Sequence, residues 1–289
     1  MCAIFGLIDY GKQLTARQKN KIISVLARAC EVRGTDATGI AYNHGGSLRI
    51  YKRPLPARKM RFRIPGGVNV VMGHTRLTTQ GNEKYNQNNH PFRGELEHAQ
   101  FALAHNGVLW NDQMLRLEQQ LPQTSIETDS YVAAQLIEKQ GTLDFDSLKN
   151  MAEKVEGSFT FTVLDEQDNV FLVKGDNPLT IYRYDGFLFY ASTEDILCKA
   201  EKRLRIHHDA SYHPAEGDIV KIDKHGDFTC GNFIPKHSYR HYWRQFPRGA
   251  YDFMDDMEIT LHDDLLDAAK AMGVSEEDVE TLFDYGCDA

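Results

Sequence analysis

The sequence contains no apolar run of membrane-spanning length, and no basic region stands ahead of a long apolar stretch at its start. We therefore expect a soluble, cytoplasmic protein without a membrane partner. Cysteine is scarce, because only five are scattered along the chain and none forms a Cys-x-x-Cys pair. This pattern suggests neither a disulfide framework nor a structural zinc site. The sequence also has no P-loop motif. We expect no metal and no cofactor.

The charge is unevenly distributed along the 289 residues, 42% of which are hydrophobic. Residues 251–289 carry 13 Asp and Glu against the single Lys270, which leaves a balance of +4 for residues 1–250. A basic and aromatic run at 237–248 precedes this acidic segment. Such runs can bind nucleic acid, but beside so many acids a linker is favoured. We therefore predict a main domain at 1–235 and an extension at 236–289, with no nucleic acid bound.

Hydrophobic periodicity predicts an alternation of strands and helices. Apolar residues at helical spacing after Thr15 predict a helix that Thr15 caps and Gly34 ends. Further helices are predicted at 112–120, 129–139 and 146–154, and strands at 2–8, 38–42, 48–51, 68–73, 101–104, 158–164, 170–173, 179–184, 187–191 and 218–222. Closely spaced strands with short turns favour antiparallel hairpins. The predicted fold class is α+β, a four-layer sandwich in which two antiparallel sheets lie between helical layers.

Cys2 is the first candidate for chemistry. Methionine aminopeptidase normally removes Met1 when so small a residue follows it, and Cys2 would then be the N-terminus. Its α-amine, with a pKa near 8, could accept the proton of its own thiol. One residue would then be both nucleophile and base. The structural alternative is that Cys2 begins a buried strand, since free cysteine is among the most buried residue types.

Three loops carry the other candidates. Arg76, in the run 73–81, can grip a carboxylate with two parallel hydrogen bonds. Asn106 and Gly107 follow a predicted strand and could form an oxyanion hole. Asp129 stands at a predicted helix start. Each has a structural alternative: a surface ion pair for Arg76, an ordinary turn for the Asn-Gly pair and an N-cap for Asp129.

Taken together and in order, these pieces resemble the glutaminase domain of the class II glutamine amidotransferases, which are N-terminal-nucleophile hydrolases. The matching pieces are residues 1–6, 33–39, 73–81, 90–91, 105–107 and 128–129. The later hairpins extend the likeness to about residue 230. The order of six pieces is more specific than any one of them. The resemblance implies the sandwich fold of that superfamily, with Cys2 at a sheet end.

The resemblance also implies a role for each matching residue. Arg76 would hold the α-carboxylate of glutamine with help from Thr79, and Asp129 would bind the α-ammonium. Asn106 and the backbone N–H of Gly107 would stabilise the oxyanion while Cys2 forms a thioester and ammonia leaves. The supporting residues would be Arg33 and Asp36, which order the loop beside the nucleophile, and His74.

Departures from the family pattern concern the recipient of the ammonia. Sugar-amidating relatives typically have tryptophan and histidine where this chain has Leu77 and Gln80, so the nucleotide-synthesis branch is favoured. Both branches continue into a large acceptor domain, for which 236–289 is too short. We therefore expect a separate synthase as partner, or a second copy of the chain, contacted through two short acidic helices in the extension.

Two alternative functions stay open at this point. The chain could be a non-catalytic or regulatory module that keeps the fold, or a stand-alone N-terminal-cysteine amidase that acts on a glutamine-like amide. Joint retention of Cys2, Arg76, Asn106, Gly107 and Asp129 favours an enzyme, because a binding module needs neither a nucleophile nor an oxyanion hole.

Overall fold

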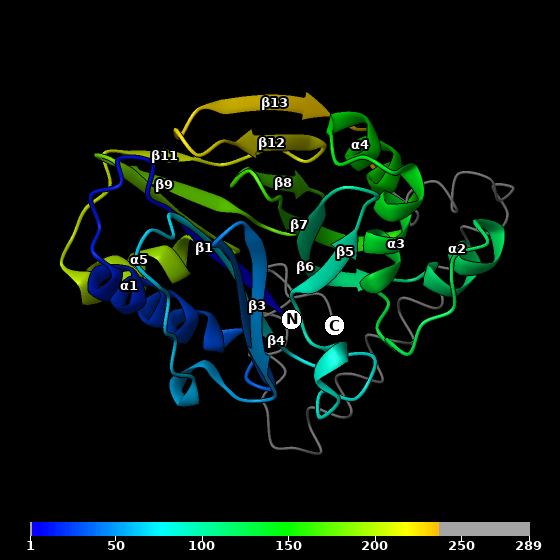
Figure 1. Ribbon diagram of the computed structural model, residues 1–289, viewed down its shortest axis with the longest axis horizontal. Helices are drawn as coiled ribbons and strands as arrows, with labels where there is room; N and C mark the ends of the chain where they lie inside the picture. Colours follow the sequence, from blue (N-terminus) through cyan, green and yellow to red (C-terminus); the bar gives the residue numbers. More distant parts are fainter. Residues whose placement is uncertain (1, 237–289) are drawn as a thin grey trace, which may run out of the picture. The chain divides into compact units, whose positions relative to one another are not determined.

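Two antiparallel sheets organise the chain in the computed structural model, which describes residues 2–236 (Figure 1). The first sheet has the strand order β11 (Ala210–Tyr212), β9 (Thr180–Tyr184), β10 (Phe187–Ala191), β1 (Ala3–Ile8), β4 (Val70–Arg76), β2 (Ala37–His44), β3 (Ser47–Arg53). The second has the order β13 (Phe228–Asn232), β12 (Asp218–Ile222), β8 (Val170–Lys174), β7 (Gly157–Leu164), β6 (Gln100–Leu109), β5 (Phe92–Glu95). The predicted pair of antiparallel sheets is confirmed.

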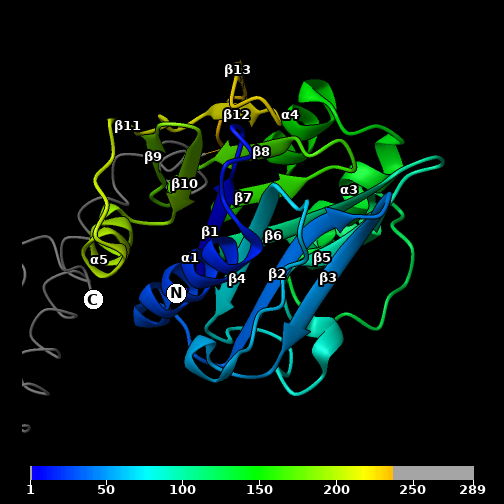
Figure 2. The same ribbon diagram turned by 60° about the vertical axis from the view of Figure 1, so that its left-hand side comes forward.

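The helices cover the two outer faces of these sheets. Figures 1 and 2 show α1 (Ala16–Ala29) and α5 (Glu194–Leu204) beside the first sheet, and α3 (Tyr131–Gln140) and α4 (Phe145–Lys154) beside the second. The shorter α2 (Asp112–Glu118) follows β6, and 3-10 turns lie at Cys30–Val32, Ala57–Lys59 and Asn86–Asn88. Buried side chains form three clusters, one under each helical pair and one between the sheets. These clusters are the interiors of a four-layer sandwich.

Strand β1 is buried along its whole length because both of its faces are covered. Phe5 and Leu7 pack under the helices of the first sheet, while Ile4 and Ile8 pack between the two sheets. The strand pairs with β10 on one side and β4 on the other, in a register that aligns Ala3 with Thr75. The residue before β1, Cys2, is thereby brought to the end of β4.

Helix α1 begins where the sequence predicts and ends earlier. Thr15 and Gln18 form a reciprocal capping box, which satisfies backbone N–H groups of the first turn. The α-helix ends at Ala29, and a 3-10 turn carries the chain on, so the prediction that Gly34 ends the helix is wrong. Gly34 serves close packing instead, because a Cβ there would lie 2.4 Å from the carbonyl carbon of Arg76.

Four elements were not predicted from the sequence: α5, β5, β11 and β13. Strand β5 is only four residues long and contains Gly94, and β13 is largely exposed. Such edge strands lack the apolar alternation from which strands are predicted. The two-helix extension and the basic linker after residue 236 lie outside the described residues.

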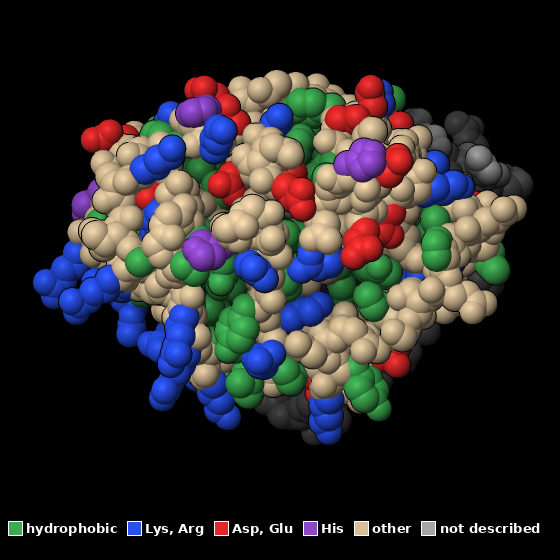
Figure 3. Space-filling model, in the orientation of Figure 1, with side chains coloured by type: hydrophobic (Ala, Val, Ile, Leu, Met, Phe, Trp, Pro, Cys, Tyr) green, Lys and Arg blue, Asp and Glu red, His purple; other side chains and the backbone are tan. Residues whose placement is uncertain are grey.

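Lys and Arg side chains gather on one part of the described surface. Figure 3 shows them at the lower left, where Figure 1 draws α1 and the turn Ala57–Lys59. The exposed cations of these two elements include Lys21, Arg28, Arg58 and Lys59. This part of the chain is therefore basic, although the net charge of the full sequence is −8.

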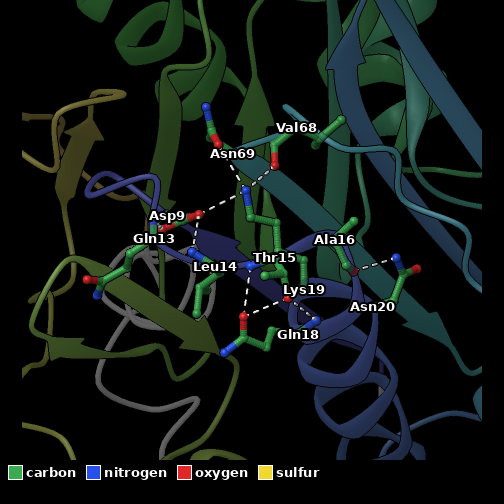
Figure 4. A network of polar contacts seen from close by, with 10 residues as sticks. All are labelled: Asp9, Gln13, Leu14, Thr15, Ala16, Gln18, Lys19, Asn20, Val68 and Asn69. Atoms are coloured by element: carbon green, nitrogen blue, oxygen red, sulfur yellow. Dashed lines mark hydrogen bonds and ion pairs between the residues drawn. The ribbon is translucent and has the colours of Figure 1, made fainter.

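A buried ion pair joins α1 to the end of β1 (Figure 4). The Lys19 ammonium lies 2.8 Å from the Asp9 carboxylate, and both side chains are almost inaccessible to solvent. Lys19 also donates to the carbonyl oxygen of Val68, and Asp9 accepts from the backbone N–H groups of Gln13 and Leu14. The charges are thus paired and hydrogen-bonded, as buried charges must be.

We expect Lys19→Met to lower the free energy of unfolding by about 3–5 kcal/mol, because it leaves the Asp9 carboxylate buried without its counterion. Urea titration followed by circular dichroism measures this loss. Lys21→Met is the matched control, since Lys21 lies on the same helix and is exposed. Equal losses in the two variants would show that the ion pair contributes nothing.

Candidate active site

Cys2 directly precedes β1, and its side chain is buried. Its Sγ donates to the carbonyl oxygen of Leu77 over 3.4 Å, and its own carbonyl oxygen accepts from Arg33 Nε at 2.8 Å. Burial raises the pKa of the thiol, whereas the nearby charge of Arg76 lowers it and that of Asp129 raises it. Because the thiol is not held as a thiolate, an attack by this sulfur needs a base that accepts its proton.

The segment after β4 is held in place by the loop before β2. Asp36 accepts from the backbone N–H of Thr78 at 2.7 Å, and its own N–H donates to the carbonyl oxygen of Arg76 at 2.9 Å. Together with the Arg33 contact to Cys2, these bonds join the loop to both the nucleophile and the end of β4. The ordering role of Arg33 and Asp36 stays a prediction. Thr79 is exposed in the same segment.

Arg76 ends β4 as a buried cation. Its Nη1 donates to Oδ1 of Asn89 at 2.8 Å, and its Nη2 donates to the carbonyl oxygens of Gln80 and Gly81. Both Nη2 hydrogens are thus occupied. Within residues 2–236, the Nε hydrogen and one Nη1 hydrogen have no assigned acceptor, so the guanidinium can still donate a charge-assisted hydrogen bond to a carboxylate.

Asp129 does not cap the helix that follows it. Helix α3 begins at Tyr131 with Ser130 at the N-cap position, so the N-cap alternative for Asp129 is wrong. One carboxylate oxygen accepts from the backbone N–H of Leu109 at 2.6 Å, and the other accepts from the Ser130 hydroxyl at 3.3 Å. The first bond fixes a buried anion against the end of β6. Each oxygen keeps a further lone pair for a cationic ligand.

Asn106 is fully buried on β6, yet neither Oδ1 nor Nδ2 of its side chain has a hydrogen-bond partner among the described residues. Its backbone carbonyl is held by the Asn177 amide at 3.0 Å. A buried amide without a partner is costly and calls for a specific explanation, such as a ligand. The next residue, Gly107, has φ +143°, and a Cβ there would lie 1.9 Å from the carbonyl oxygen of Ser158, so only glycine fits.

Three histidines pack behind these groups. His74 lies 2.9 Å from the carbonyl oxygen of His105 through Nε2, and burial lowers the pKa of His74 to about 3. The neutral ring therefore donates its Nε2–H to that carbonyl and links β4 to β6. The His90 ring lies against His74 at an interplanar angle of 40°, with ring centroids 4.1 Å apart. Because the neutral His74 ring donates its Nε2–H to a backbone carbonyl, we expect it to stabilise the contact between β4 and β6 and not to accept the thiol proton.

The structure therefore brings together most of the predicted site residues. The charges of Arg76 and Asp129 both act on Cys2, and Asp129 also acts on His105, which adjoins Asn106. Two supporting side chains were not predicted from the sequence. Asn89 accepts a hydrogen bond from Arg76, and Asn177 donates one to the backbone carbonyl of Asn106. The polar run before Pro91 was the only sequence signal for Asn89, and nothing in the sequence singles out Asn177.

Residues 2–236 contain neither a cluster of metal ligands nor a helix suited to a membrane. No group of three or more His, Cys, Asp or Glu side chains there could hold a metal ion. None of the helices in that part of the chain combines the length and apolar character that crossing a membrane requires.

Comparisons with known proteins agree with this geometry. Residues 74–199 match the family described as glutamine amidotransferase domain. Glutamine–fructose-6-phosphate aminotransferase of Staphylococcus epidermidis is 29% identical over 233 residues, which are 77% of this chain and 37% of the relative. The Staphylococcus aureus enzyme of the same name is 29% identical over 250 residues, or 83% of this chain and 39% of the relative. The chain thus spans less than two fifths of the length of these curated relatives.

A solved structure shares the fold. Glutamine phosphoribosylpyrophosphate amidotransferase of B. subtilis superposes with a TM-score of 0.66 at 22% identity, over 81% of this chain and 49% of that one. Two sheets between helical layers, with a cysteine leading into the central strand, define an N-terminal-nucleophile hydrolase fold. Within that fold class, residues 74–199 match a glutamine amidotransferase domain, and over about four fifths of its length the chain is similar to the class II glutamine amidotransferases named above.

The named relatives fall on both branches of the family. The curated relatives carry the name of a sugar-phosphate aminotransferase, whereas the structural neighbour carries that of a phosphoribosylpyrophosphate amidotransferase. The preference for the nucleotide-synthesis branch, drawn from Leu77 and Gln80, stays a prediction.

Proposed function

We propose that this domain hydrolyses the side-chain amide of glutamine to glutamate and ammonia, with Cys2 as the nucleophile. The observation that carries the proposal is the buried Asn106 amide, which has no partner among the described residues and adjoins Gly107. A hydrogen-bond donor held in this way is preorganised for charge that develops only during acyl transfer. Arg76 and Asp129 supply one charge of each sign, as the two ends of a free amino acid require.

The reaction can be written with these groups. The Cys2 sulfur attacks the carboxamide carbon while the α-amine of Cys2 takes the thiol proton, so the mechanism requires removal of Met1, which lies outside the described residues. Asn106 Nδ2–H and the Gly107 N–H stabilise the tetrahedral oxyanion. The C–N bond then breaks, and the nitrogen leaves as ammonia with the proton that the amine returns. Water hydrolyses the γ-glutamyl thioester and regenerates the thiol.

The direct test is to incubate the purified full-length chain with L-glutamine and to measure glutamate and ammonia. D-glutamine and L-asparagine are the specificity controls. Mass spectrometry after treatment with the glutamine analogue 6-diazo-5-oxo-L-norleucine should show Met1 absent and the label on Cys2. Absence of glutamate, or a label on Cys30 or Cys198, would overturn the assignment.

We propose that the ammonia passes to a separate acceptor enzyme, or to one assembled on a second copy of the chain. Ammonia released into neutral water is almost entirely protonated and is then no nucleophile, so a glutaminase domain is useful only beside an acceptor. The curated relatives are named as aminotransferases, and transfer of an amino group to an acceptor supports this proposal. The chain matches 37% of the first relative, so most of that protein lies outside the matched part, as a separate acceptor requires.

Arg76→Lys should raise the KM for glutamine by about 10–100 fold and change kcat only a few fold. Lysine keeps the charge but lacks the planar guanidinium whose donors Asn89, Gln80 and Gly81 fix in place, so the charged hydrogen bond to the substrate is lost, at a cost of about 1.5–3 kcal/mol. Steady-state kinetics measure the split between KM and kcat. Arg61→Lys, at an exposed arginine, is the control. A fall in kcat at unchanged KM would contradict the binding role.

A further inference from the structure

Lys52 is a partly buried cation near the end of β3 whose charge has an unusual setting. Its Nζ donates to the carbonyl oxygens of Asn89 at 2.5 Å and Pro91 at 3.0 Å, and it lies 5.2 Å from the centre of the Phe92 ring. Over residues 2–236, no carboxylate forms an ion pair with it. Buried ammonium groups are normally paired with an anion. The two carbonyl oxygens take the place of that anion here.

The backbone that Lys52 holds belongs to a residue that contacts the candidate site. Asn89 gives its carbonyl oxygen to Lys52 and accepts from Arg76 Nη1 through Oδ1 at 2.8 Å. The Asn89 amide nitrogen donates to the carbonyl oxygen of Glu83 at 2.7 Å. In return, the Asn86 amide donates to the backbone oxygen of Lys52 at 3.0 Å. A chain of hydrogen bonds therefore runs from Lys52 through Asn89 to the guanidinium of Arg76.

We infer that Lys52 is a positioning residue for glutamine binding: its ammonium fixes the Asn89–Pro91 backbone, and Asn89 thereby holds Arg76 with its remaining donors directed at the substrate carboxylate. This inference rests on the proposed function. It assigns to Lys52 no contact with the substrate and no part in the chemical step. Loss of the ammonium should therefore appear in KM and leave kcat nearly unchanged.

The same contacts make glutamine binding sensitive to pH. Burial and, to a smaller extent, the Arg76 charge lower the pKa of Lys52 to about 8. The other titratable group facing it is His90, whose pKa burial holds well below its usual value, so His90 is neutral. Below pH 8 the Lys52 ammonium makes charge-assisted bonds, which are about twice as strong as neutral ones. Above pH 8 it loses the charge, so its hold on Asn89 weakens and KM rises.

The test compares K52M and K52R with wild type in the full-length chain. K52M should raise the KM for L-glutamine about tenfold at nearly constant kcat, which corresponds to the loss of one hydrogen bond to a charged group. K52R should stay within about twofold of wild type, because the guanidinium keeps the charge and can reach the same carbonyls. K59M, which removes an exposed lysine, is the control.

Two further readouts separate positioning from a general loss of structure. In a double-mutant cycle, K52M should add no increase in KM to that of N89A, since both act through Asn89. From pH 7 to pH 9, the KM of wild type should rise relative to that of K52R, and this ratio cancels the titration of glutamine itself. If K52M does not fold, the comparison of K52R with wild type decides alone.

The failures are distinguishable. An unchanged KM in K52M, a KM effect fully additive with N89A, a loss confined to kcat, or a constant ratio of wild-type to K52R KM across this pH range would each overturn the inference. If wild type hydrolyses no glutamine at all, the proposed function itself is wrong.

Discussion

Cys2→Ala should abolish glutamine hydrolysis while the fold stays intact. The variant removes the only atom proposed to attack the substrate, and loss of a nucleophile in a hydrolase costs about 10⁴-fold in kcat or more. The Sγ contact with the carbonyl oxygen of Leu77 is weak, so its loss should change stability little. The rate is measured as glutamate formed under saturating glutamine, and folding by thermal denaturation.

Cys230→Ala is the control for this prediction, because Cys230 is an exposed cysteine on β13 and has no part in the proposed mechanism. It should keep full activity. Substantial glutamate production by Cys2→Ala would mean that another group performs the attack. The same loss of activity in both variants would point to damage unrelated to the nucleophile.

Asn106→Ala should lower kcat by about 100–1,000 fold with little change in KM, because an oxyanion donor acts chiefly in the transition state. Its stability should not fall. Since the Asn106 amide is buried without a partner among residues 2–236, replacing it removes an unsatisfied polar group, and the free energy of unfolding should stay constant or rise. Activity lost at undiminished stability is typical of a residue placed for function.

Asn88 provides the matched comparison for stability. It is equally buried, but its amide donates to Asn82 and Glu127 and accepts from the Glu127 N–H. Asn88→Ala should therefore lower the free energy of unfolding by about 1–3 kcal/mol. Equal destabilisation by both substitutions would show that Asn106 is held by the protein like any structural asparagine, and the oxyanion role would lose its support.

Much of the fold could be predicted because its strands and turns carry local signals. The predicted strands 179–184 and 187–191 pair as the antiparallel hairpin of β9 and β10, across a turn in which Gly186 has φ +80°. The capping box at Thr15 was likewise readable. Helix α5 could also have been found, since Ile196, Leu197 and Ala200 are buried on one face after Thr193.

The candidate site was predicted only as far as its residues follow strands. Short motifs located Arg76 and Asn106, but these residues were predicted to lie in loops after the strands 68–73 and 101–104, whereas they lie on the longer strands β4 and β6. Lys52 and Asn89 are separated by 37 positions, and their contact depends on how two sheet edges meet. Within a single strand, Lys52 looks like an ordinary exposed charge. Long-range contacts of this kind have no local signature, so the sequence could not indicate them.

The position of β1 in the middle of its sheet limits where another polypeptide can be fused to this chain. Strands border β1 on both sides, and Cys2 directly precedes it, so a polypeptide fused ahead of this cysteine would occupy the candidate site and convert the proposed catalytic amine into an amide. Gene fusion can therefore add a functional module only downstream of β13. An affinity tag used for purification therefore belongs at the C-terminus, because an uncleaved tag ahead of Cys2 would yield a folded protein without activity.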